Sequence, residues 1–202
     1  MGALAWLRRL LRRAPAAGEQ LEPGSLRDSL AALLGHLRRR RIDCALVGGV
    51  ALAARGVVRG TRDLDFLIPE EKEQDVYELM TQLGFETLDR GQSVSSYLLE
   101  RLRVDFLIAR REYGRRMIER AEPVALSPGV SVRVALAEDL IAMKLQAMVG
   151  NPSRGKDRAD IEGLLRAHAD SIKMDGLREY ARAIGAESEL EAILADIAGR
   201  RG

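Results

Sequence analysis

The segment Val47–Ile68 reads VGGVALAARGVVRGTRDLDFLI, and the rest of the chain is interpreted outward from it. It starts at the end of an apolar run, residues 42–47, which predicts a buried strand. Two glycines and a short helical pattern over residues 50–55 follow, and after a loop two aspartates open a second apolar run. The segment therefore predicts a strand, a tight turn, a helix, a loop and a second strand, with charge at the start of that strand.

The two aspartates, Asp63 and Asp65, are the unusual part of this pattern. Side chains alternate between the faces of a strand, so both carboxylates point the same way and Leu64 points the other way. Like charges this close repel one another, and partial burial strengthens the repulsion. A divalent cation removes that cost, and carboxylate oxygens are ligands that suit Mg²⁺. The aspartate pair therefore predicts a magnesium site.

The same segment carries groups that suit phosphate. Gly48 and Gly49 let a phosphate approach the backbone, and the helix that follows points free N–H groups and the positive end of its dipole at it. Arg59 and Arg62, in the loop, can bind further phosphate oxygens through their forked guanidinium groups. Gly-Gly and Asp-x-Asp each occur often without a function, so the prediction rests on their order within one segment.

In this order, the Gly-Gly turn and the Asp-x-Asp strand resemble the active-site signature of nucleotidyltransferases of the DNA polymerase β-like superfamily. GGVALAARG followed by RGTRDLDFLI is most similar to the abortive-infection (AbiEii-like) toxin branch. The resemblance implies transfer of a nucleoside monophosphate from an NTP to an acceptor hydroxyl, with two Mg²⁺ ions that Asp63 and Asp65 both ligate. Some relatives carry a serine in place of Gly49, which here keeps only its backbone donor. The expected phosphate-binding residues are Gly48, Gly49, Arg59 and Thr61.

The tetrapeptide Asp-Phe-Leu-Ile occurs twice, at residues 65–68 and 105–108. In both places a charged residue opens an apolar strand where an aliphatic residue is expected. Coincidence between two buried strands explains the repeat; alternatively, neighbouring strands bring Asp105 to the rim that carries Asp63 and Asp65. The resemblance implies the second interpretation, because a third acidic residue on a later strand usually accompanies Asp-x-Asp there. Asp105 would then complete the metal shell and accept the proton of an attacking hydroxyl.

Two helical patterns towards the C-terminus place charges within their apolar stripes. Lys144 lies amid the stripe of the helix predicted over residues 137–149, and in the helix from residue 156 to about 168, Asp157 lies within the stripe and Asp160 at its edge. A buried charge is costly unless it is paired. Lys144 either pairs with an aspartate and fixes the helices together, or reaches a triphosphate as a point charge. The order EDLIAMK, then KDxxD, resembles the second motif of the toxin branch, so we favour a catalytic and nucleotide-binding role for Lys144. The roles of the two aspartates stay open.

These patterns together predict a mixed α/β (α+β) fold of the minimal nucleotidyltransferase type, in which helices flank a mixed sheet and a C-terminal helical appendage follows. Beyond the central segment, helices are predicted over residues 25–40, 69–83, 112–120, 137–149, 156–168, 175–184 and 187–198, and hairpins over 94–108 and 124–134. The expected parts are a basic amphipathic helix with a linker (1–24), the nucleotidyltransferase core (25–135) and the helical appendage (136–202).

Composition predicts a soluble, cytoplasmic protein. Hydrophobic residues make up 47% of the chain, enough for a packed core, and no apolar run approaches the roughly 20 residues of a membrane span. Cys44 is the only cysteine, which excludes an internal disulfide and a cysteine zinc cluster. The net charge is only +2, yet arginine far outnumbers lysine. Arginine favours phosphate recognition, although codon bias explains the excess equally well.

The identity of the acceptor stays open at the level of sequence. The first 41 residues hold nine arginines against three acidic residues, which favours an RNA acceptor, such as a tRNA 3′ end, over a small molecule. A toxin of this branch would also have a cognate antitoxin as its partner. The alternatives are an antibiotic (small-molecule) nucleotidyltransferase and a non-catalytic nucleotide-binding module. Three mutually repelling carboxylates argue against the last, because a degenerate site has no reason to keep them.

Overall fold

The computed structural model describes residues 26–58, 60–61, 63–127, 130–150 and 155–199. The predicted N-terminal helix and linker, residues 1–24, lie outside this described part, as do Arg59 and Arg62. The chain divides into two compact units. The first runs to Ala54 and resumes from Val58 to Ala135, and the second contains Arg55–Val57 and the residues from Leu136 onward.

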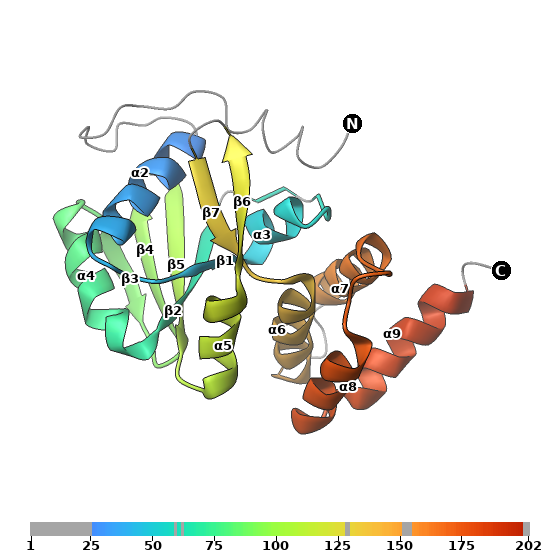
Figure 1. The fold of residues 1–202 in the computed structure, drawn as a ribbon. Coiled ribbons are helices and arrows are strands. Elements are labelled where there is room, and N and C mark those ends of the chain that lie inside the picture. The colour runs from blue at the N-terminus through green and yellow to red at the C-terminus, as the bar shows by residue number, and fades with distance from the viewer. Residues whose placement is uncertain (1–25, 59, 62, 128–129, 151–154, 200–202) are drawn as a thin grey trace. The chain divides into compact units, whose positions relative to one another are not determined.

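The described part of the first unit is built on a seven-stranded mixed sheet of order β3-β4-β5-β2-β1-β7-β6 (Figure 1). The pairs β2–β5 and β1–β7 are parallel, and the other neighbouring pairs are antiparallel. The mixed α/β class predicted from the sequence is therefore confirmed. The strands are β1 (Ala45–Val47), β2 (Leu64–Pro69), β3 (Glu86–Arg90), β4 (Val94–Leu99), β5 (Leu102–Ala109), β6 (Glu122–Ser127) and β7 (Val130–Val134).

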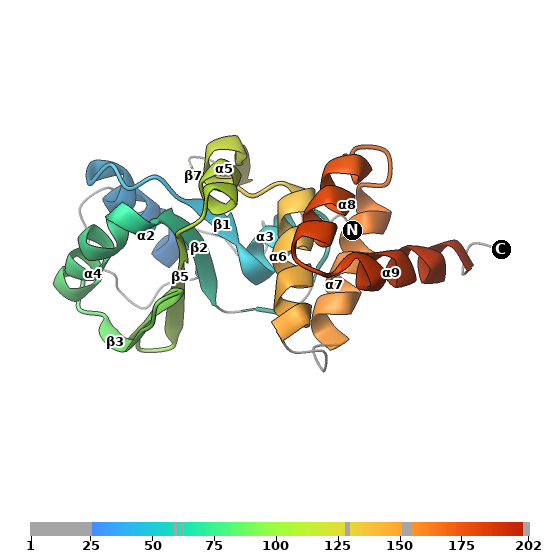
Figure 2. The ribbon, with the colours of Figure 1, turned by 90° about the horizontal axis from the view of Figure 1, so that it is seen from below.

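Helices α2 and α4 lie along one face of this sheet, and α5 lies on the opposite face (Figures 1 and 2). Leucines spaced three or four residues apart in α2 supply its buried stripe, and these are Leu30, Leu33, Leu34 and Leu37. The sheet contributes an aromatic cluster in which Phe66 and Phe106 stack at 5.6 Å and Tyr97 meets Phe106 edge-on at 5.9 Å. The first unit's helices are α2 (Leu26–Arg39), α3 (Gly48–Ala54), the 3₁₀ turn η1 (Glu70–Lys72), α4 (Glu73–Gln82) and α5 (Glu112–Arg120).

Two predicted boundaries around the central segment are wrong by a few residues. Helix α3 begins at Gly48 itself, so both glycines are its first residues and not a turn that precedes it. Pro69 ends β2 and does not begin a helix, because its ψ of 145° is extended. The fixed φ of proline suits either conformation, so the sequence alone does not distinguish them.

The second unit contains four described helices, α6 (Ala137–Gly150), α7 (Gly155–Ala167), α8 (Met174–Ala183) and α9 (Glu187–Gly199). Within this unit α6 packs on α7, while α8 packs on α6 and α9. The segment Arg55–Val57 belongs to it as well, since His168 Nε2 lies 2.7 Å from the Arg55 carbonyl oxygen. Across the residues that the structure describes, no helix is long and apolar enough to cross a membrane.

Candidate active site

The two copies of Asp-Phe-Leu-Ile lie side by side in the sheet, as the sequence predicts. Strands β2 and β5 are parallel neighbours, and their register pairs Asp65 with Asp105, Phe66 with Phe106 and Ile68 with Ile108. Residues paired across neighbouring strands project from the same face. The phenylalanines are fully buried, whereas both aspartates retain some exposure. The repeat therefore aligns two carboxylates at one level of the sheet.

The carboxylate of Asp65 occupies the space beside Gly48. A Cβ atom on Gly48 would lie 1.9 Å from Asp65 Oδ2, and Gly48 has a φ of +62° that L residues rarely adopt. In the same way, a Cβ on Gly49 would lie 2.7 Å from Cβ of Thr61. The glycines thus make room for two side chains of the site itself, a requirement that the phosphate interpretation of the sequence did not include.

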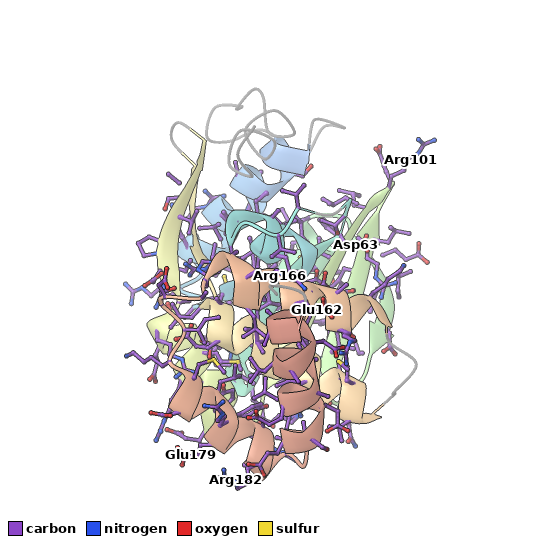
Figure 3. The ribbon with its side chains drawn as sticks, turned by 90° about the vertical axis from the view of Figure 1, so that its right-hand side faces the viewer. Asp63, Arg101, Glu162, Arg166, Glu179 and Arg182 are labelled. Carbon is purple, nitrogen blue, oxygen red and sulfur yellow. The ribbon has the colours of Figure 1, made fainter. Side chains whose placement is uncertain are left out.

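Asp63 lies just before the first residue of β2 and is exposed; Figure 3 shows its position. Its backbone N–H donates to Thr61 Oγ1 at 3.4 Å, a local contact that joins the end of the loop to the start of the strand. Thr61 therefore lies against both Gly49, at the start of α3, and the first aspartate. Of the expected site residues in this unit, the structure brings together Gly48, Gly49, Thr61, Asp63, Asp65 and Asp105.

Arg103 is a residue of this site that the sequence interpretation passed over. Its Nε donates to Asp105 Oδ1 at 3.0 Å and Oδ2 at 3.1 Å, and its Nη2 donates to Ser96 Oγ at 3.3 Å. The hydrogen bond and charge of Asp105 raise the pKa of the Arg103 guanidinium, and the charges of Asp63 and Asp65 raise it further. Positions 103 and 105 share a face of β5, so an Arg-x-Asp spacing in a strand was the available signal.

The fit of this cluster to a metal ion can be judged from its donors. Among the described residues, no group of three or more His, Cys, Asp or Glu side chains is gathered to hold a metal ion, and Asp105 is paired with Arg103. The donor atoms nevertheless suit a hard cation, because carboxylate oxygens are the ligands that such ions take. The carboxylates of Asp63, Asp65 and Asp105 are also close enough for all three to act on the Arg103 guanidinium. In this structure the positive charge at Asp105 is the Arg103 guanidinium.

Lys144 lies in the second unit and pairs with both aspartates that the sequence singled out. Its Nζ lies 2.6 Å from Asp157 Oδ1 and 2.7 Å from Asp160 Oδ2. The three side chains are only 14%, 6% and 7% exposed, so the charges are removed from water together. The structure thus contains the ion pairs that the structural interpretation of Lys144 expects. The catalytic and nucleotide-binding roles of Lys144 stay a prediction.

A third buried acid on α7, Glu162, has its own cations. Arg158 lies 3.4 Å and Arg166 2.9 Å from its carboxylate, each one helical turn away, and Figure 3 labels Glu162 and Arg166 on neighbouring turns. Arg158 also pairs with Asp196 of α9. Helix α7 therefore holds its neighbours through charge as well as through its apolar stripe.

Cys44, just before β1, is not suited to nucleophilic catalysis. Burial, with a smaller contribution from the charge of Asp43, raises the pKa of its thiol to about 12. The thiol is therefore protonated at neutral pH, and the thiolate is the nucleophilic form of cysteine.

Solved structures place this fold among nucleotidyltransferases. An antigenic nucleotidyltransferase-like protein from Paracoccidioides brasiliensis has a TM-score of 0.55 at 17% identity, over 84% of this chain and 92% of that chain. The antibiotic-resistance factor ANT(2″)-Ia, in solution, gives 0.53 at 16%, over 84% and 92%. A putative nucleotidyltransferase from Thermotoga maritima gives 0.52 at 14%, over 65% and 89%. At such identities the likeness establishes the fold alone.

The particular family follows from the sequence of the chain. Residues 81–199, more than half of the chain, match the family described as nucleotidyl transferase AbiEii toxin of type IV toxin–antitoxin systems. The chain belongs to this family, which confirms the predicted family and enzyme class. The match includes Asp105 and Lys144 and begins after the Gly-Gly and Asp-x-Asp segment. A comparison with curated protein sequences finds no match.

Proposed function

We propose that this protein transfers a nucleoside monophosphate from an NTP to a hydroxyl of RNA, and that it does so with Mg²⁺ at the Asp63, Asp65 and Asp105 cluster. One observation carries the proposal: the register of β2 and β5 sets Asp65 beside Asp105 on one face of the sheet. Asp63 joins them electrostatically, since all three carboxylates act on the Arg103 guanidinium. Mutually repelling carboxylates with partial exposure are what a hard cation stabilises.

The residues of the chain would divide the work between donor and acceptor. Gly48, Gly49, Arg59 and Thr61 are the proposed phosphate-binding residues, and two bound Mg²⁺ ions would stabilise the attacking and leaving oxygens. Asp105 would accept the proton of the attacking hydroxyl, which requires it to exchange its contact with Arg103. The acceptor oxygen then bonds to the α-phosphorus as the bond to the bridging oxygen breaks, and pyrophosphate leaves.

The choice of RNA as acceptor rests on charge, and the toxin role rests on the family. Nine arginines and three acidic residues in the first 41 positions favour a polyanionic acceptor. Membership of a family of type IV toxin–antitoxin toxins supports growth inhibition as the biological effect and a cognate antitoxin as the partner. The donor nucleotides make the cytoplasm the expected place of action.

The test is to incubate the purified chain with each NTP labelled at the α-phosphate, together with Mg²⁺ and total cellular RNA. We expect one NTP to label RNA, and Asp65→Asn and Asp105→Asn to abolish the label. The matched control is Asp43→Asn, which changes an exposed aspartate outside the cluster and should keep full activity. Asp65→Asn should melt no lower than the wild type without metal, because the repulsion is relieved.

Full labelling by both cluster variants in Mg²⁺ would refute the metal assignment. A reaction that labels a small hydroxylated compound and leaves RNA unlabelled would instead support the antibiotic-type activity. Nucleotide binding without transfer to any acceptor would support the non-catalytic module.

A further inference from the structure

The Arg103 side chain is arranged as a counter-cation for the acidic cluster. Arg103 and Asp105 lie two residues apart on β5, and the guanidinium Nε reaches both carboxylate oxygens at 3.0 and 3.1 Å. Its Nη2 is held by Ser96 Oγ at 3.3 Å. Ser96 faces Asp105 across the β4–β5 pairing and is only 3% exposed. The arginine is therefore anchored to a buried side chain as well as to the acid.

The two members of this pair differ in their access to water. The Asp105 side chain is 16% exposed, whereas the Arg103 side chain is 47% exposed. Leaving the carboxylate would carry the guanidinium into solvent, where it is fully hydrated, while Asp105 stays on the rim. Exposed ion pairs are weak because water competes for both partners. The contact can therefore be exchanged when a stronger cation arrives.

The charges of the cluster favour replacement of the Arg103 guanidinium at Asp105 by a divalent cation. Without Arg103, the carboxylates of Asp63, Asp65 and Asp105 would repel one another, and the repulsion grows as water is excluded. A divalent cation supplies twice the charge in a smaller volume and binds carboxylate oxygens directly. It also repels a guanidinium at the same oxygens, so the metal and the arginine cannot both occupy Asp105 without cost.

We propose that Arg103 is a positioning residue that offsets the charge of Asp105 in the metal-free enzyme and competes with the divalent cation for that carboxylate. The inference rests on the proposed function, in which Asp105 ligates the metal and accepts a proton. Arg103 then sets the metal concentration at which the site assembles, and Ser96 sets how firmly the arginine is held.

The experiment measures Mn²⁺ binding to the full chain by calorimetry, with no nucleotide present. We expect Arg103→Gln to lower the Kd for Mn²⁺ by about tenfold, because one competing positive charge is removed. Arg103→Lys keeps the charge but loses the forked contact with Asp105 and Ser96, so it should lower the Kd by less than Arg103→Gln does. Ser96→Ala removes the anchor without changing charge and should lower the Kd by a smaller factor. Arg101→Gln, an exposed arginine at the turn of the same hairpin (Figure 3), is the matched control and should change nothing.

Thermal melting provides a readout that does not depend on turnover. Metal-free Arg103→Gln should melt below the wild type, and saturating Mn²⁺ should raise its melting temperature by more than it raises that of the wild type. An equal or higher Mn²⁺ Kd in Arg103→Gln would overturn the inference, and if that variant does not fold, an unchanged or higher Kd in Ser96→Ala would overturn it. Transfer of label to RNA by the wild type is measured separately, so competition at Asp105 can fail while the proposed activity stands. Absence of Mn²⁺ binding to every variant would overturn both the competition and the metal assignment.

Discussion

At the scale of single residues, the site depends on how closely Gly48 and Asp65 approach each other. The carboxylate of Asp65 fills the volume that any larger residue at position 48 would need. The positive φ of Gly48 independently requires glycine, because any residue with a side chain is strained in this backbone conformation even where there is room for it. This glycine is therefore required both by the backbone and by a proposed metal ligand, and the two requirements can be separated by experiment.

Gly48→Ala is expected to destabilise the fold and to displace Asp65. The left-handed conformation alone should cost about 1–2 kcal/mol of unfolding free energy. Gly84→Ala is the matched control, since Gly84 also has a positive φ, of 81°, but a Cβ added there would meet no atom within 4 Å. Both variants should lose similar stability in denaturant titrations from strain, with a further loss in Gly48→Ala. Mn²⁺ binding should be lost only in Gly48→Ala, so equal Mn²⁺ affinity in the two variants would contradict a role for this contact.

At the scale of elements, alternation along strands and charges within helical stripes were the most informative parts of the sequence. The repeated Asp-Phe-Leu-Ile predicted two neighbouring strands because a charged residue opened each otherwise apolar run, and β2 and β5 pair in that register. The sequence could not show that Asp105 meets Arg103, because spacing fixes the face of a strand but not the rotamer of a long side chain. The sequence likewise predicted that Lys144 could pair with Asp157 or Asp160. It could not show that the packing of α6 on α7 brings the lysine to both aspartates.

Lys144→Met tests the two roles of this lysine. The change leaves the carboxylates of Asp157 and Asp160 buried without their shared cation, and breaking a buried pair costs about 3–5 kcal/mol. We therefore expect a marked drop in melting temperature, although methionine itself suits an apolar stripe. A contact with the triphosphate would in addition raise the KM for NTP or lower kcat.

The matched control for this test is Lys72→Met. Lys72 pairs with Asp75 at 2.8 Å, but both side chains are more exposed, at 31% and 44%, so the loss should be small. A lower melting temperature in Lys144→Met with unchanged kinetics would refute the catalytic role. Unchanged stability would contradict the structural pairing.

At the scale of the whole molecule, the family assignment and the acidic cluster come from overlapping but different parts of the chain. The matched range, residues 81–199, includes β5 with Asp105 and all four described helices of the second unit. The Gly-Gly pair and the Asp-x-Asp sequence lie before it and were recognised by their order of residue types. Two separate stretches thus indicate the same enzyme class, whereas neither identifies the acceptor. Only the excess of positive charge bears on the identity of the acceptor, and that excess lies in the first 41 residues, with nine arginines against three acidic residues.

Removal of residues 1–24, which lie outside the described part of the chain, tests the RNA acceptor. This segment carries Arg8, Arg9, Arg12 and Arg13 against Glu19 and Glu22. Each phosphate contact that is lost should lower the slope of log affinity against log salt by about 0.7–0.9. We expect RNA modification to weaken and its salt dependence to flatten, while hydrolysis of the NTP changes much less. A full-length variant with the four arginines changed to glutamine separates charge from packing and should behave like the deletion. If the deleted protein modifies RNA as well as the full chain does across a salt series, the segment makes no contact with the acceptor, and the charge argument for RNA fails with it.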